Sequence, residues 1–267
     1  MRFKLTLQIK SADGKREFPI NYQYPLQSAI YDILSKSDVE FTTHLHDYGY
    51  QYNGGKIHKL FAFSNLIVPR PGIAIDKERE RLIIKSETVY LFISFQPEKD
   101  TQHFIQGIFT QQSFRIYDQL SELEFIIQEV QVLPPLEYSP EDVFNTLSPV
   151  CVSLRNDKGH MDYIRPDHPL YETGILTGLL SRYRTITGKE YEGETYCHLK
   201  VLSEPKSALI RIKSYNKNET RVRGFKYQFQ INLPEPLMQI AWESGLGEKG
   251  SMGFGMIEKV ETGSNGV

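Results

Sequence analysis

The sequence has few of the residues that membrane-spanning, disulfide-rich or zinc-binding proteins need. Its 267 residues include only two cysteines, Cys151 and Cys197, which are too few for a disulfide framework or a cysteine-based zinc site. No apolar run reaches the roughly 18 residues that span a bilayer, and residues 2–9 alternate polar with apolar side chains, unlike a signal peptide. We therefore expect a globular cytoplasmic protein with no membrane partner and with both cysteines reduced and buried.

An excess of positive charge is also missing, because 31 Lys and Arg residues stand against 33 Asp and Glu residues, for a net charge of −2. This balance is unusual for a protein that binds nucleic acid. The segment 206–226 differs from the rest, with a local charge of +6 from one acid, Glu219, and seven basic residues: Lys206, Arg211, Lys213, Lys217, Arg221, Arg223 and Lys226. A local basic face can bind a phosphate backbone, but a solvated pair of strands would carry the same residues. Charge alone leaves both interpretations open.

Hydrophobic periodicity predicts an α+β fold of two similar units. The first unit is predicted as a strand at 2–10, a helix from Pro25, a short helix from a Ser37/Glu40 capping box to His46, strands at 60–68 and 82–95, a helix at 101–112 and a strand at 125–132. The second is predicted as a strand at 146–154, a helix at 170–183, strands at 196–202, 208–213 and 225–231, a helix at 237–242 and a strand at 254–260.

This order indicates two tandem ferredoxin-like (RRM-like) βαββαβ domains with antiparallel sheets, a fold whose sheet face commonly binds RNA. Three prolines, at 134, 135 and 140, predict a linker at 134–142 between domains at 1–133 and 143–267. An unrelated RRM-like protein is a weaker interpretation, since it would need aromatic side chains on the central strands. The candidates for that role are Phe61, Phe63, Tyr90 and Phe92.

The segment Gly245–Gly255 contains five glycines in eleven positions. It formally matches G-x-G-x-x-G, but it follows a predicted helix and precedes a strand, the reverse of a dinucleotide-binding loop. Lys249 precedes Gly250 instead of following it, so the segment is not a Walker A loop either. Exposed amides in such a loop can cradle phosphates, whereas a tight turn alone needs only one or two glycines.

The pattern Gly-hydrophobic-Gly-Glu-Lys-x-Ser-hydrophobic-Gly-Phe-Gly resembles the C-terminal glycine-rich loop of the repeat-associated RNA-binding proteins of CRISPR systems, the RAMP superfamily. More narrowly, it is similar to the endoribonucleases that cut the precursor transcript within each repeat. The resemblance extends to Tyr24-Pro25-Leu26-Gln27, to Leu45-His46, to Lys59-Leu60-Phe61 and to Thr146-Leu147-Ser148-Pro149. It covers most of the chain, and the glycine-rich loop is its most specific part.

The resemblance implies metal-independent RNA cleavage without a cofactor, in which the 2′-hydroxyl upstream of the cut attacks the phosphate and leaves a 2′,3′-cyclic phosphate and a 5′-hydroxyl. It implies Tyr31, His46 and Lys59 as catalytic residues. Histidine, with a pKa of about 6.5, can move a proton at neutral pH, lysine can stabilise the charge of the phosphorane, and tyrosine can position a hydroxyl or protonate the leaving oxygen. We find no convincing cluster of carboxylates or histidines for a metal.

Several assignments stay open at this point. His44 and His58 compete with His46, and Lys56 competes with Lys59. Tyr48, Tyr50 and Tyr52 either stack on unpaired bases or fill the loop. The alternative function is a non-catalytic crRNA-binding subunit of a CRISPR effector complex.

The expected partner is CRISPR repeat RNA, and an effector complex or a second copy of the chain are further expected partners. The residues expected to bind RNA lie in the glycine-rich loop and the basic segment: Gly245, Gly247, Lys249, Gly250, Ser251, Gly253, Gly255, Lys206, Arg211, Lys213, Arg221, Arg223 and Lys226.

Overall fold

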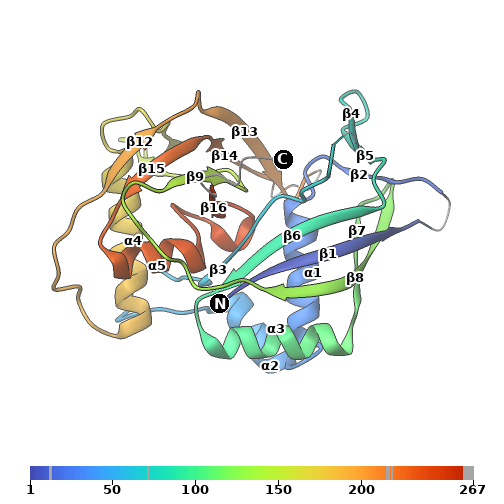
Figure 1. The fold of residues 1–267 in the computed structure, drawn as a ribbon, viewed down its shortest axis with the longest axis horizontal. Helices are drawn as coiled ribbons and strands as arrows, with labels where there is room; N and C mark the ends of the chain where they lie inside the picture. Colours follow the sequence, from blue (N-terminus) through green and yellow to red (C-terminus); the bar gives the residue numbers. More distant parts are fainter. Residues whose placement is uncertain (12–13, 71, 215–216, 218, 261–267) are drawn as a thin grey trace, which may run out of the picture.

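A computed structural model describes residues 1–11, 14–70, 72–214, 217 and 219–260 (Figure 1). Five strands form an antiparallel sheet in the first half, in the order β3 (Phe61–Phe63), β6 (Thr88–Phe95), β1 (Arg2–Lys10), β8 (Glu122–Val132) and β7 (Ser113–Tyr117). Figure 1 shows the helices on one side of this sheet: α1 (Gln23–Ser35), α2 (Val39–Asp47) and α3 (Glu98–Thr110). The chain order β1–α1–β3–β6–α3–β8 is the expected βαββαβ unit.

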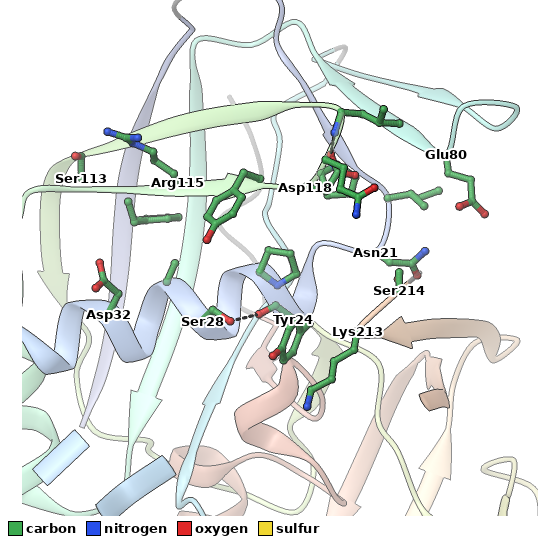
Figure 2. A pocket seen from close by; sticks show the side chains of 18 of the residues that line it. Asn21, Tyr24, Ser28, Asp32, Glu80, Ser113, Arg115, Asp118, Lys213 and Ser214 are labelled. Carbon is green, nitrogen blue, oxygen red and sulfur yellow. Dashed lines mark hydrogen bonds between the residues drawn. The ribbon is translucent and has the colours of Figure 1, made fainter. Parts of the chain in front are cut away.

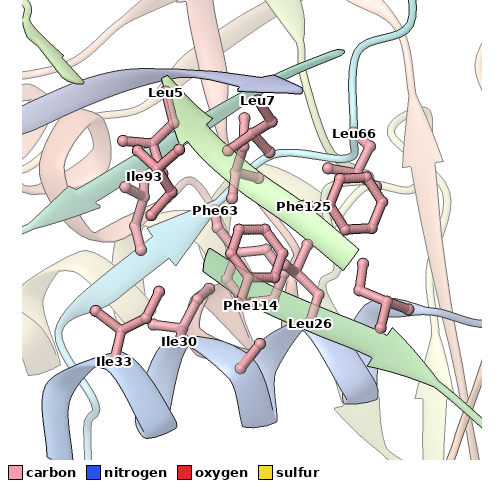
Figure 3. Packing of buried hydrophobic residues seen from close by; sticks show 14 of the residues in the cluster. Leu5, Leu7, Leu26, Ile30, Ile33, Phe63, Leu66, Ile93, Phe114 and Phe125 are labelled. Atoms are coloured by element: carbon pink, nitrogen blue, oxygen red, sulfur yellow. The ribbon is translucent and has the colours of Figure 1, made fainter. Parts of the chain in front are cut away.

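The core of this half lies between the sheet and α1 (Figure 3). Leu5 and Leu7 of β1 point to the same face of the sheet because side chains alternate along a strand, and they meet Leu26, Ile30 and Ile33 of α1. Each such side chain stabilises the fold by about 1.5–3 kcal/mol when fully buried. This packing fixes the rotation of α1 about its axis.

Four strands form the main sheet of the second half, in the order β12 (His198–Val201), β15 (Gln228–Asn232), β9 (Val143–Thr146) and β16 (Ile257–Lys259). Its helices are α4 (Tyr171–Thr187) and α5 (Glu235–Ser244). The order β9–α4–β12–β15–α5–β16 repeats the βαββαβ unit. The α+β class with two antiparallel ferredoxin-like units is confirmed, while the domain boundaries at 133 and 143 stay a prediction.

Several predicted strands are wrong in extent. The predicted strand 82–95 is two strands, because β5 (Arg81–Ile84) joins β2 (Glu17–Pro19) and β4 (Ile73–Asp76) in a separate three-stranded sheet. The predicted strand 225–231 divides at Tyr227 into β14 (Thr220–Lys226) and β15. The predicted strand 146–154 runs from the last residue of β9 into β10 (Ser153–Arg155), and most of it lies between these two strands. β10 pairs with β11 (Met161–Tyr163).

The predicted capping box of α2 is also wrong. Asp38 is the N-cap, and its carboxylate accepts a hydrogen bond from the Phe41 amide at 2.8 Å. The Ser37 hydroxyl instead contacts Nδ1 of His103 at 2.8 Å. Cys151 and Cys197 are free and buried, as expected. Within the described residues, no helix is both long enough and apolar enough to cross a membrane.

Candidate functional site

Three elements bring Tyr31, His46 and Lys59 together. Tyr31 lies on the buried face of α1, His46 in the last turn of α2, and Lys59 just before β3. The rings of Tyr31 and His46 meet edge to face, with centroids 5.1 Å apart. The Lys59 ammonium donates to the carbonyls of His46 and, at 2.6 Å, of Leu45. The candidate residues therefore form one cluster, although they are distant in sequence.

Helix geometry explains the place of Lys59. The last four carbonyls of an α-helix have no partner within the helix and carry partial negative charge. The Lys59 ammonium binds two of these carbonyls at the end of α2. An ammonium has three N–H donors, so one remains for another ligand. Burial lowers the pKa of Lys59, and the nearby Asp47 carboxylate opposes this effect.

The two aromatic members of the cluster have contrasting environments. Tyr31 is only 8% exposed, and burial, followed by the charge of Asp100, raises the pKa of its hydroxyl. Tyr31 therefore stays protonated near neutral pH. The His46 side chain is 65% exposed, and its Nδ1 lies 2.7 Å from the Asp47 carboxylate. This contact orients the imidazole and leaves Nε2 for another ligand.

The competing residues lie in other surroundings. His44 is exposed, and its ring contacts Tyr48 with centroids 5.6 Å apart. His58 is only 9% exposed, and its Nε2 lies 2.9 Å from the Ser181 hydroxyl of α4. Burial lowers the pKa of His58 to about 4, aided by the positive charges of Arg182 and Lys56. His58 is thus neutral near pH 7 and contacts the second half of the chain.

The glycines of the segment 245–255 have a packing reason. A Cβ atom at Gly250 would lie 2.8 Å from the Phe61 carbonyl of β3, and one at Gly253 would lie 2.7 Å from the Phe63 ring. Both distances are too short for a side chain. The loop therefore packs closely against β3, next to the segment that carries Lys59. Phe61 and Phe63 are fully buried in this contact, so they do not offer the stacking platform of an RRM-like protein.

A buried arginine that sequence reasoning missed holds this loop. Arg182 of α4 is 6% exposed, and its guanidinium donates to the carbonyls of Ser244, Gly245 and Gly247. The loop amides of residues 246, 248, 253 and 255 also donate to carbonyls within the protein. In the sequence, Arg182 follows Ile175 and Leu179 at helical spacing and so lies on the apolar stripe of α4. A charged residue on that stripe is the sequence signal that could have identified Arg182.

The basic residues of 206–226 lie on two faces of a hairpin rather than one. β13 (Lys206–Ile212) pairs with β14, and the register sets Arg211 opposite Arg221 and Lys206 opposite Lys226. Residues directly opposite each other share a face, and the faces alternate along a strand. Arg211, Arg221 and Arg223 therefore share one face, and Lys206 and Lys226 lie on the other. The basic side chains of this segment therefore do not form one continuous face, and their contact with RNA stays a prediction.

The arginine face of the hairpin is partly engaged by other side chains. Arg211 pairs with Glu80, Arg221 contacts Glu219 at 3.1 Å, and Arg223 donates to the Ser207 hydroxyl at 3.1 Å. On the other face, burial lowers the pKa of Lys226. Lys213, just beyond β13, extends its ammonium over the Tyr24 ring, 5.8 Å from the centroid.

Both halves of the sequence match models of one family. Residues 17–131 match the model described as CRISPR-associated protein Cas6, N-terminal, and residues 133–259 match the model described as CRISPR associated protein Cas6, C-terminal. The chain belongs to the Cas6 family. The CRISPR family resemblance seen in the sequence is thereby confirmed.

Individual Cas6 relatives agree over nearly the whole chain. The CRISPR-associated endoribonuclease Cas6 1 of Methanocaldococcus jannaschii is 26% identical over 272 residues, covering 98% of this chain and 93% of the relative. A putative CRISPR-associated endoribonuclease-like protein, Cas6nc, of Pyrococcus horikoshii is 26% identical, covering 91% of this chain and 93% of the relative. A solved RAMP protein described as binding different RNA substrates has a TM-score of 0.80 at 22% identity, covering 98% of this chain and all of that one.

A cleft in this Cas6 chain lies away from the cluster. The cleft has a volume of about 1080 Å³. It lies between the start of α1, β7 with the turn that follows it, and Lys213 (Figure 2). Tyr31, His46 and Lys59 do not line it. Its acidic side chains are already paired: Asp118 contacts Arg81 at 2.6 Å, Asp32 contacts Lys36 at 3.4 Å, and Glu80 pairs with Arg211. The described residues also contain no group of three or more His, Cys, Asp or Glu that could hold a metal ion.

Proposed function

We propose that this chain is an endoribonuclease that cuts CRISPR precursor transcripts within their repeats, without a metal, by attack of a 2′-hydroxyl on the adjacent phosphate. The observation that carries the proposal is the cluster itself, in which a protonated tyrosine, an exposed oriented imidazole and a helix-bound ammonium meet. These groups can serve as the general acid, the general base and the charge-stabilising cation of a metal-free phosphoryl transfer. The endoribonuclease named among the relatives supports the same activity.

In the proposed mechanism, His46 acts as the base. With Nδ1–H donated to Asp47, Nε2 carries the lone pair and accepts the proton of the 2′-hydroxyl. The 2′-oxygen then bonds to phosphorus, and the bond to the 5′-oxygen breaks. Tyr31 donates its proton to that leaving oxygen, and the free N–H of Lys59 binds a non-bridging oxygen as charge develops. The products are a 2′,3′-cyclic phosphate and a 5′-hydroxyl.

The proposed RNA contacts lie outside the cluster. In the glycine-rich loop, Lys249 and Ser251 are partly exposed, so their side chains can reach a phosphate while the glycines allow the close packing on β3. Arg221 and Arg223 of the hairpin are exposed and suit backbone contacts that carry no sequence information. An effector complex or a second copy of the chain remains a proposed partner.

Chelation tests the absence of a metal in the proposed mechanism. Single-turnover cleavage of a labelled repeat RNA should proceed at an unchanged rate in excess EDTA, because the protein side chains supply every proton and charge. The cut ends should be a cyclic phosphate and a 5′-hydroxyl. Activity that disappears with EDTA and returns with magnesium would contradict the mechanism.

A non-catalytic crRNA-binding subunit is the second candidate. The Cas6nc protein of Pyrococcus horikoshii is described only as endoribonuclease-like, and a shared fold does not by itself carry a shared activity. Overnight incubation with labelled repeat RNA separates the two candidates. RNA that is bound but never cut would support the non-catalytic subunit.

A further inference from the structure

Asp100 is a fully buried carboxylate that the proposed chemistry does not use. It lies in the first turn of α3 and is 0% exposed. Its Oδ1 accepts a hydrogen bond from the Tyr50 hydroxyl, whereas its Oδ2 has no hydrogen-bond partner among the described residues. Burial raises the pKa of Asp100 to about 6. A carboxylate in such a place costs stability compared with an apolar side chain, so stability alone does not account for it.

Tyr50 connects Asp100 to the segment that carries Lys59. The amides and carbonyls of Tyr50 and His58 exchange two hydrogen bonds of 2.8 Å, which close the loop between them. Lys59 follows His58 directly and binds the end of α2. A Cβ atom at Gly49 would lie 3.0 Å from the Lys59 Cδ, so the chain entering Tyr50 packs on the Lys59 side chain. The Tyr50 anchor thus lies beside the side chain it would hold.

The same loop is also attached to the second half of the chain. Beyond the contact of His58 with Ser181, Lys56 lies 3.9 Å from the Glu248 carboxylate of the glycine-rich loop. Asp100 supplies the contact to the first half, and its charge also acts on the Tyr31 hydroxyl. The loop is therefore held from both sides, and Asp100 lies close enough to Tyr31 for its charge to act on that hydroxyl.

We propose that Asp100 and Tyr50 are positioning residues of the active site: their hydrogen bond holds the loop 49–58 so that Lys59 stays at the end of α2, beside Tyr31 and His46. The kinetic part of this inference rests on the proposed function. A tyrosine in this loop is then a partly buried anchor, not a platform for unpaired bases. The competing explanation is a purely structural contact, whose loss would destabilise the protein without acting through Lys59.

A double-mutant comparison separates these explanations. Tyr50→Phe removes only a hydroxyl, and Asp100→Asn keeps an acceptor for that hydroxyl but removes the charge. Tyr50→Phe should slow single-turnover cleavage at saturating protein about tenfold, less than the roughly 10²-fold that a 1 Å misplacement of a catalytic group can cost. Asp100→Asn should have a smaller effect in the same direction, and RNA affinity should stay unchanged.

In a Lys59→Ala background, Tyr50→Phe should slow cleavage less than twofold further, because the residue it positions is already gone. The matched control, Tyr117→Phe, changes an exposed tyrosine at the end of β7 and should cut like wild type in both backgrounds. Equal tenfold losses with and without Lys59 would overturn the inference, and so would full activity of Tyr50→Phe.

Amide hydrogen exchange supplies a readout that does not depend on cleavage. In Tyr50→Phe, the amides of Tyr50 and His58 should exchange at least tenfold faster, since the anchor that protects them is lost. Unchanged protection overturns the inference whatever the kinetics. If wild-type protein cuts no RNA, the proposed function fails while faster exchange still supports the anchor. If cleavage is normal in Lys59→Ala, the catalytic role of Lys59 fails, and with it the kinetic part of the inference.

Discussion

At the scale of single residues, His46 is the group on which the proposed chemistry depends most. Its imidazole is exposed to a ligand and oriented by Asp47, a combination suited to proton transfer. His46→Ala should lower the single-turnover cleavage rate by about 10²-fold or more, the usual scale for a proton-transfer residue. RNA affinity should change only a few-fold, because one imidazole is a small part of a contact dominated by phosphates.

Two other histidines serve as controls for this substitution. His44→Ala should cut nearly normally, since its ring contacts Tyr48 and not the cluster. His58→Ala should act mildly and mainly through stability, because the imidazole is buried and bonded to Ser181. If His44→Ala or His58→Ala is inactive while His46→Ala cuts at the wild-type rate, the active site is misplaced.

The candidate cluster could be predicted from the sequence, but the residues that support it could not. Tyr31, His46 and Lys59 follow from the resemblance of short motifs around them, and chemistry explains their types. Asp100 and Arg182 are buried charged residues that hold neighbouring loops by hydrogen bonds. Whether a single charged residue is buried depends on how its helix packs on neighbouring elements. Neither residue lies in a motif, so only the structure shows their contacts.

At the scale of elements, the glycine-rich loop depends on Arg182. Replacing it with methionine keeps much of the apolar stem but leaves the loop carbonyls it now binds without donors. Each buried acceptor left unpaired costs about 1–3 kcal/mol, so Arg182→Met should lower the free energy of unfolding by about 3 kcal/mol or more. Urea denaturation measures this change.

Arg184→Met provides the matched control on the same helix. Arg184 is partly exposed and contacts Glu190 at 3.4 Å, and surface pairs of this kind contribute about 0–1 kcal/mol. Its loss should therefore hardly change the urea midpoint. Equal effects of the two substitutions would show that the Arg182 hydrogen bonds do not hold the loop.

The errors in predicted elements have a physical pattern. Periodicity identified β1, α1, α3 and α4, which have one long buried face each. Periodicity did not separate β5 from β6, because these two apolar strands follow each other closely in the sequence but belong to different sheets. Similarly, β14 and β15 are separated only by Tyr227, which is buried like its neighbours. Local pattern does not show which strands pair, because that depends on distant partners.

At the scale of the whole molecule, the two halves of the chain contact each other at several places. The guanidinium of Arg2 lies over the Trp242 ring, 3.8 Å from the centroid, and donates to the Ile257 carbonyl. The glycine-rich loop packs on β3, and the loop 49–58 contacts α4. The cluster on the first half is therefore supported by the second half. This arrangement suits an RNA strand that is bound across both halves and cut at one point.

The attacking group is the most direct test of this account. A repeat RNA with a single 2′-deoxy nucleotide just upstream of the cut should bind with nearly unchanged affinity, since phosphates dominate the contact. This RNA should not be cleaved at that position, because the nucleophile is missing. A control RNA with its 2′-deoxy nucleotide two positions away from the cut should be cleaved normally. Cleavage of the first substrate at the normal site and rate would mean that water attacks, and it would contradict the proposed mechanism.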